Sequence, residues 1–138
     1  MITNLADYFL PEQEFYLQNI TYDRIENTTD SENHTLNCLD NISVDTNDDT
    51  VKITVTRTLK FEPEELFSLT VSFGAILKFN PQNKSEYKWR EINMAEEFRY
   101  NGDFVIGNLM QRITLQIAQI TSSFGQSPII LPPSVSKK

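Results

Sequence analysis

Apolar and polar residues alternate with a period of two over much of the first part of the chain, and this alternation predicts β-strands. The stretch 51–61 alternates most regularly, and the stretches 36–44 and 67–79 follow the same rule. An antiparallel sheet with one covered and one solvated face has this pattern. The apolar face of the two clearest strands comprises Val51, Ile53, Val55, Leu59, Phe61, Phe67, Leu69, Val71, Phe73, Ala75, Leu77 and Phe79.

A further strand is predicted over 15–25, with an irregularity at Asn19. Leu17 belongs to the apolar phase before Asn19, whereas Ile20 and Tyr22 take the opposite phase after it. A single change of phase in a period-two pattern indicates a β-bulge at this point.

Two charged residues, Asp40 and Arg57, fall in the apolar phase of their strands. For Arg57 we expect a position at the edge of the sheet, where the aliphatic stem packs and the guanidinium reaches water. Cys38 also lies in an apolar phase, and we expect it to be a buried, inert thiol.

Polar stretches at 26–35, 45–49 and 62–65 separate the predicted strands and are expected to form exposed connections. The stretch 45–49 carries oxygen-bearing side chains at the spacing of a calcium loop. However, Thr50 stands where such a loop needs glycine, and Thr56 stands where it needs a bidentate glutamate. We therefore predict a hairpin turn there and no metal site.

The last third of the chain changes to a helical period. A weak pattern predicts a short helix over about 86–99, and a stronger one predicts a long helix over about 104–124 that Gly125 ends. The prolines of 128–133 prevent a helix from continuing, so this stretch is expected to run extended across a surface. The apolar seam of the long helix recurs at heptad spacing through Ile106, Met110, Ile113, Ile117, Ile120 and Phe124.

The other faces of this long helix are unusually poor in charge. Arg112 is its only charged residue, Leu109 and Leu115 lie off the seam, and Gln116 and Gln119 are neutral. A freely solvated helix face usually carries pairs of Lys and Glu. We therefore predict that these five residues form a subunit interface, and that the protein is a homo-oligomer.

Length and charge restrict the class of protein. The chain of 138 residues predicts one domain over 1–138, with frayed ends at about 1–10 and 134–138. Its net charge of −7 disfavours binding to nucleic acid. We find no export signal at the N-terminus and no stretch of membrane-spanning length, so we expect a cytoplasmic protein without membrane insertion.

Catalytic or cofactor chemistry has no support from sequence motifs. Cys38 is the only cysteine and His34 the only histidine, so neither a disulfide within the chain nor a zinc ligand set can form. We find no nucleotide-binding loop and no hydrolase motif. We therefore predict no catalytic residues, no metal and no cofactor. An enzyme would need a pocket in which titratable groups converge.

Three segments together make the chain resemble the SecB family of export chaperones. The stretch 51–57 (VKITVTR) is similar to the family's V-x-V-T strand, and 66–79 (LFSLTVSFGAILKF) is similar to its A-F-x-x-E-V-x-Y-x-G-I-F-x-L strand. The stretch 127–133 (SPIILPP) after the long helix resembles the closing F-P-P-L-x-L-x-P-I-N-F. The chain lacks the family's Cys-Pro pair before the long helix, its P-Y-A-R-E helix start and its zinc-binding tail.

The resemblance implies an α+β fold: a four-stranded antiparallel sheet followed by a short and a long helix, with the long helices packed between dimers in a dimer or tetramer. It also implies an ATP-independent holdase for unfolded or preprotein clients, with the translocase motor as a possible further partner. The alternative is an interaction module on the same fold that serves one partner, such as an antitoxin. Apolar grooves would bind the client, and the positions that match are Ile42, Val44, Ile129, Ile130 and Leu131.

Overall fold

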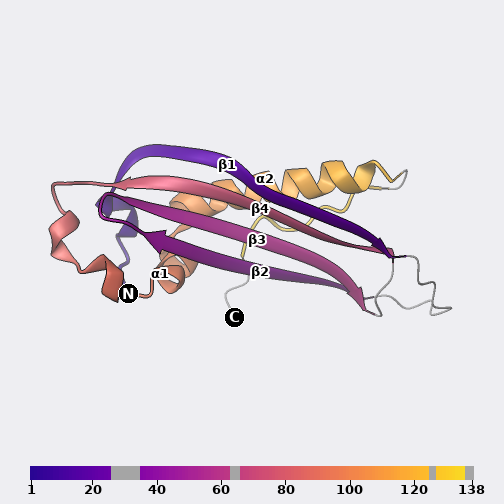
Figure 1. Cartoon of the computed structure of the whole chain (residues 1–138), viewed down its shortest axis with the longest axis horizontal. Helices are drawn as coiled ribbons and strands as arrows, with labels where there is room; N and C mark the ends of the chain where they lie inside the picture. The colour runs from indigo at the N-terminus through magenta and orange to yellow at the C-terminus, as the bar shows by residue number, and fades with distance from the viewer. Residues whose placement is uncertain (26–34, 63–65, 125–126, 136–138) are drawn as a thin grey trace.

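The computed structural model describes residues 1–25, 35–62, 66–124 and 127–135. They form one antiparallel sheet of four strands in the order β1-β4-β3-β2, with helices on one of its faces (Figure 1). The α+β fold and the antiparallel sheet are therefore confirmed. The strands are β1 (Phe9–Ile25), β2 (Thr35–Thr46), β3 (Thr50–Glu62) and β4 (Leu66–Phe79). The helices are η1 (Leu5–Tyr8), η2 (Lys84–Glu86), η3 (Trp89–Glu91), α1 (Met94–Asn101) and α2 (Asp103–Ser122).

The first strand is longer than its alternation predicts. It begins at Phe9, whose ring stacks on that of Phe79 with the two centroids 5.0 Å apart. The pairing of β1 with β4 is irregular between Phe9 and Gln13, so the period-two pattern of apolar residues does not predict the first residues of this strand. A second shift of register lies between Leu17 and Asn19, so the predicted bulge is confirmed.

The core lies between the sheet and the helices, on the face that the alternation marks as apolar. Val51, Ile53 and Val55 of β3 are fully buried there. Along α2 the seam residues Met110, Ile113 and Ile117 are buried against the sheet, as the heptad spacing predicts. Gly125, the expected stop of this helix, lies outside the described residues.

The short helix starts later than its weak pattern indicates. Two 3₁₀ turns, η2 and η3, precede α1, and Asn93 caps α1 by accepting a hydrogen bond from the main-chain N–H of Glu96. Trp89 and Phe98 are nevertheless buried. The segment between β4 and α1 therefore keeps its inward side chains without forming one continuous helix.

The N-terminal residues are packed, in contrast to the frayed segment expected over about 1–10. Leu5 is fully buried and Ile2 is 6% exposed. The main-chain N–H of Ile2 donates a hydrogen bond of 2.9 Å to Oε2 of Glu97 in α1. Position in the sequence alone does not predict fraying, because apolar side chains at a terminus can pack into a core in the same way as internal ones. At the other end Val135 is buried, and 136–138 lie outside the described residues.

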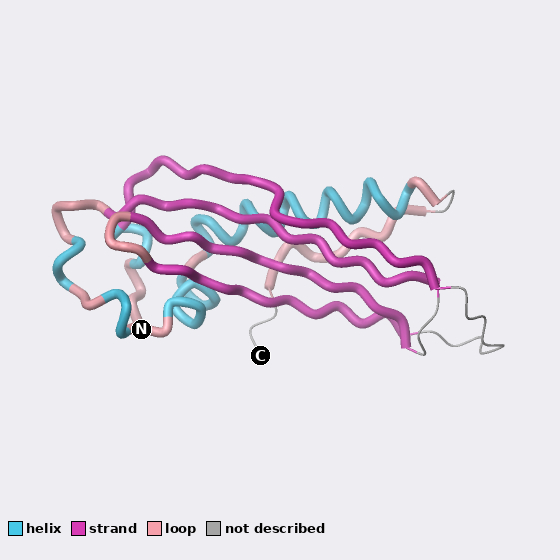
Figure 2. The backbone as a smooth tube through the Cα atoms, in the orientation of Figure 1, coloured by secondary structure: helices cyan, strands magenta, loops and turns pink. Residues whose placement is uncertain are grey.

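The opposite face of the sheet has no helix over it among the described residues (Figure 2). Its threonines and serines contact one another across the strands. The hydroxyls of Thr56 and Ser72 lie 2.8 Å apart, and those of Thr58 and Thr70 lie 3.3 Å apart. The predicted division into an apolar and a polar face is therefore confirmed. Among the described residues, no helix is both long and apolar enough to cross a membrane.

Candidate functional site

A buried ion pair stands at the centre of the helix-facing side of the sheet. Arg57 of β3 and Asp40 of β2 are direct partners in the register of the two strands. Nε of Arg57 donates to Oδ1 of Asp40 at 2.7 Å, and Nη2 donates to Oδ2 at 2.9 Å. The two exceptions to the apolar alternation are therefore each other's partner.

This geometry corrects the edge position expected for Arg57. β3 is an inner strand, and the Arg57 side chain is only 3% exposed. The hydrogen bonds to Asp40 raise the pKa of Arg57, against the opposing effect of burial. A buried guanidinium is tolerated here because a bidentate carboxylate compensates its charge.

The same guanidinium holds the C-terminal segment, by which we mean residues 127–135. Nη1 of Arg57 donates to the carbonyl oxygen of Pro132 at 2.9 Å, and Nη2 donates to that of Ser134 at 3.1 Å. Prolines 132 and 133 have no N–H to donate, so this stretch can be held mainly through its carbonyl groups. The guanidinium of Arg57 therefore donates the hydrogen bonds that the main-chain N–H groups of a neighbouring strand would otherwise donate.

A second contact fixes the start of the C-terminal segment to α2. The N–H of Ile129 donates to Oγ1 of Thr121 at 2.8 Å, while that hydroxyl donates to the carbonyl of Ile117 at 2.8 Å. Thr121 is only 2% exposed. The segment forms no helix or strand and lies on the same side of the sheet as α2 (Figure 1).

The residues predicted to line a client groove take different positions. In the C-terminal segment, Ile129 and Leu131 are half-buried against the core, whereas Ile130 is 72% exposed. Val44 is also half-buried, but Ile42 is only 4% exposed. Ile42 pairs with Val55 and belongs to the buried core, so it does not line an exposed groove of the chain.

The predicted interface residues on α2 also divide into two groups. Leu109 is fully buried in the chain's own core, because the apolar stripe of α2 is wider than a heptad seam, and its assignment to an interface is corrected. Arg112, Leu115 and Gln119 are exposed, and Gln116 is half-buried. The guanidinium carbon of Arg112 lies 4.6 Å from the ring centroid of a phenylalanine on β1, Phe15. The exposed residues thus lie on the β1 side and outer side of the helix.

An aromatic cluster forms near the far end of the helix-facing side, and sequence reasoning missed it as a unit. Adjacent rings in it have centroids 5.2 to 5.8 Å apart. Its members lie near the ends of three strands and of α2. The only indication of this cluster in the sequence is an aromatic residue near each of these ends. Tyr22 is 41% exposed and Phe124 is 40% exposed. The aromatic cluster consists of Tyr22, Phe61, Phe67 and Phe124.

Cys38 is exposed, which corrects the expectation of a buried thiol. It faces the helix side, opposite Leu59, in the first half of β2, whereas α1 lies beside the arrowhead end of that strand (Figure 1). Partial shielding of the sulfur raises the pKa of Cys38, while the charge of Arg57 opposes this shift. His34 lies outside the described residues.

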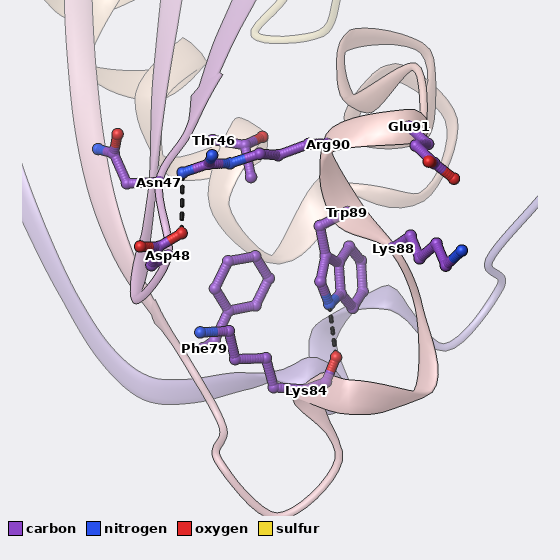
Figure 3. Close-up of a pocket in the computed structure, with 9 residues that line it drawn as sticks. All are labelled: Thr46, Asn47, Asp48, Phe79, Lys84, Lys88, Trp89, Arg90 and Glu91. Carbon is purple, nitrogen blue, oxygen red and sulfur yellow. Dashed lines mark hydrogen bonds and ion pairs between the residues drawn. The ribbon is translucent and has the colours of Figure 1, made fainter.

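A cavity of about 360 Å³ opens at the β2–β3 hairpin, away from the C-terminal segment (Figure 3). Two of its basic groups contact the hairpin: Nη2 of Arg90 lies 2.8 Å from Oδ1 of Asp48, and Nζ of Lys84 lies 3.5 Å from Oδ1 of Asp49. The indole N–H of Trp89 donates to the main-chain carbonyl of Lys84 at 2.8 Å. The lining includes no cysteine, histidine or serine.

Metal-ligating side chains do not gather in the parts of the chain that the structure describes. No group of three or more His, Cys, Asp or Glu residues there could hold a metal ion. The feature that remains is apolar surface beside a buried donor that contacts main-chain carbonyls.

Comparison with known proteins gives a fold but no sequence relative. No family model matches the sequence, and no curated protein matches it. A solved structure of a SecB-like chaperone from Mycobacterium tuberculosis, in complex with a ChAD peptide from the HigA1 antitoxin, superposes with a TM-score of 0.69. The likeness covers 93% of this chain and 88% of that chain at 14% sequence identity. This chain therefore has the SecB-like fold, with a strongly divergent sequence.

The ion pair gives a prediction about stability. Replacing Arg57→Met alone should lower the free energy of unfolding by about 3–5 kcal/mol, because it leaves the Asp40 carboxylate buried without a partner. The double replacement Asp40→Leu with Arg57→Met should cost much less, since no charge then stays buried. Urea unfolding of the three proteins provides the measurement. A single variant within about 1 kcal/mol of the wild type would show that the pair is not buried as described.

Proposed function

We propose that this protein is an ATP-independent chaperone that binds unfolded or preprotein chains. The observation that carries the proposal is the partly exposed aromatic cluster on the helix-bearing side of a SecB-like fold. Exposed apolar surface beside polar residues is typical of protein-binding sites. A cytoplasmic location fits this role and belongs to the proposal.

The proposed binding surface follows β1 and reaches the end of α2. Leu17 is 52% exposed on the helix-facing side of β1, and Tyr22 lies further along the same strand. The ring of Phe124 lies 5.3 Å from that of Tyr22. Aromatic and aliphatic side chains along one strand can bind the apolar residues of an extended client, whatever the exact sequence of that client. We propose that the C-terminal segment borders this surface, whereas Val44 lies on β2 at the other edge of the sheet.

A dedicated role for a single partner is the second candidate. It is favoured by one observation: the SecB-like neighbour was solved with a peptide from an antitoxin. On this alternative the same surface would bind one protein tightly and suppress the aggregation of general clients poorly. The translocase motor is a further partner to be tested.

We also propose that the protein is a homo-oligomer that uses the exposed side of α2. Leu115 is 60% exposed there, and its neighbours Arg112 and Gln119 are also exposed. A large aliphatic side chain on a face with a single charge is more stable when a second subunit covers it.

Aggregation of a chemically denatured model protein tests the chaperone role. The wild type should suppress light scattering by the denatured client at a near-stoichiometric ratio without ATP. Leu17→Ser should lose most of this activity, because it removes apolar surface on the helix-bearing side. Leu39→Ser is the matched control: Leu39 is 67% exposed, but it pairs with Thr58 on the opposite face of the sheet. No suppression by the wild type, or equal activity of both variants, would contradict the proposal.

Multi-angle light scattering at micromolar concentration tests the oligomer. We expect a dimer or tetramer for the wild type and a smaller species for Leu115→Asp, since a buried charge at an interface is costly. Asn41→Asp, at an exposed position opposite Thr56 on the polar face of the sheet, is a control for added charge away from α2. A monomeric wild type would end this part of the proposal.

A further inference from the structure

The C-terminal segment occupies a site whose chemistry does not depend on the segment's own sequence. We propose that the slot between Arg57, Thr121 and the sheet binds extended, proline-containing apolar segments of other polypeptides, and that these displace residues 127–135. This inference rests on the proposed function, because it assigns a ligand and a means of control to the polypeptide-binding side. The C-terminal segment itself is the occupant from which the ligand's chemistry is inferred.

The first argument is that Arg57 contacts main chain. Nη1 and Nη2 of Arg57 donate to the carbonyl oxygens of Pro132 and Ser134, and every polypeptide carries such oxygens. At the other end, Oγ1 of Thr121 accepts a main-chain N–H, that of Ile129. A slot that binds a chain through its backbone tolerates many side chains.

The second argument is that the slot keeps its shape without the segment. Asp40 binds Arg57 through two hydrogen bonds of 2.7 and 2.9 Å, so the guanidinium is oriented by the sheet alone. Thr121 is oriented in the same way by its bond to the carbonyl of Ile117. Loss of the segment frees two donors of Arg57 that contact the carbonyl oxygens of Pro132 and Ser134. The open slot can therefore bind the carbonyl oxygens of another chain.

The third argument concerns the side chains that the slot selects. Ile129 and Leu131 pack inward and Ile130 points outward, so alternate residues are read, as in an extended ligand. Prolines at the following positions fix an extended backbone before binding and reduce its entropic cost. Apolar residues two apart, followed by proline, are therefore the pattern that fits.

The fourth argument is that the segment can leave at low cost. It lies at the end of the described chain and has neither a helix nor a strand of its own. Side chains hold it at Thr121 and Arg57, whereas a strand would be held by a ladder of main-chain bonds. Segments of this kind open locally without unfolding the rest of the domain. Displacement by a client is therefore compatible with the rest of the fold.

A fluorescent nonapeptide with the sequence of residues 127–135 is the probe, and anisotropy measures its binding to the full-length chain. The wild type should bind it weakly, because its own segment competes. Leu131→Ser weakens the internal segment but leaves the slot unchanged, so the peptide should bind about tenfold more tightly. Ile130→Ser is the matched control, one residue away and outward-facing, and should give no increase. Equal affinity for wild type and Leu131→Ser would overturn the inference.

A second measurement guards against loss of folding in Leu131→Ser. Circular dichroism and urea unfolding check the variant, and a chain ending at residue 126 replaces it if it is unfolded. In either background a peptide carrying the Leu131→Ser change should bind at least about tenfold more weakly, and one carrying Ile130→Ser should bind as before. Arg57→Lys should weaken peptide binding, since lysine does not reproduce the planar donor fork. Insensitivity to both changes would mean that the slot does not bind the peptide.

The outcomes separate this inference from the proposed function. If the wild type fails to suppress aggregation but Leu131→Ser binds the peptide more tightly, the slot is real and the chaperone role is wrong. If the wild type suppresses aggregation and Leu131→Ser changes neither peptide binding nor suppression, the chaperone role stands and the slot is wrong.

Discussion

The bidentate pair between Arg57 and Asp40 is the interaction on which the rest of this side of the molecule depends. It places a charged group in a face made of apolar residues, and it is stable only because the two side chains are direct partners across β2 and β3. The pair leaves donors of Arg57 that point away from the sheet, and these hold Pro132 and Ser134. An electrostatic contact between two strands thereby decides where the C-terminal segment runs.

Periodicity predicts which residues share a face, and it does so well for this sheet and for the seam of α2. It does not predict what covers that face at each point. Cys38 and Ile42 lie in the same apolar phase of β2, yet one is exposed and the other is buried. Figure 1 shows α1 beside only the arrowhead end of this strand. The heptad seam predicts Leu109 outside the core, but the sheet covers a wider stripe of α2 than the seam describes. Leu109 is therefore buried. Arg57 and Asp40 could have been paired from sequence, had the register of the hairpin at 47–49 been counted back along both strands.

The two faces of the sheet have separate consequences for function. One is polar, and its hydroxyls contact one another. The other carries the helices, the aromatic cluster and the C-terminal segment, so the features proposed to bind polypeptides lie on one side (Figures 1 and 2). The SecB-like fold accounts for this arrangement. The sequence is only 14% identical to that of the solved chaperone, so the likeness is seen in the structure and not in a comparison of sequences. The alternating apolar pattern that a covered sheet requires can stay the same while the individual residues change.

The central claim is that a client takes the place of residues 127–135, and amide hydrogen exchange at Ile129 tests it most directly. This N–H is bonded to Thr121 when the C-terminal segment is in its slot. Adding a saturating proline-containing apolar peptide should speed exchange at Ile129, while exchange at the core residue Val55 stays unchanged. Slower exchange at Ile129 on binding would show that the segment closes over its client, and would contradict the account.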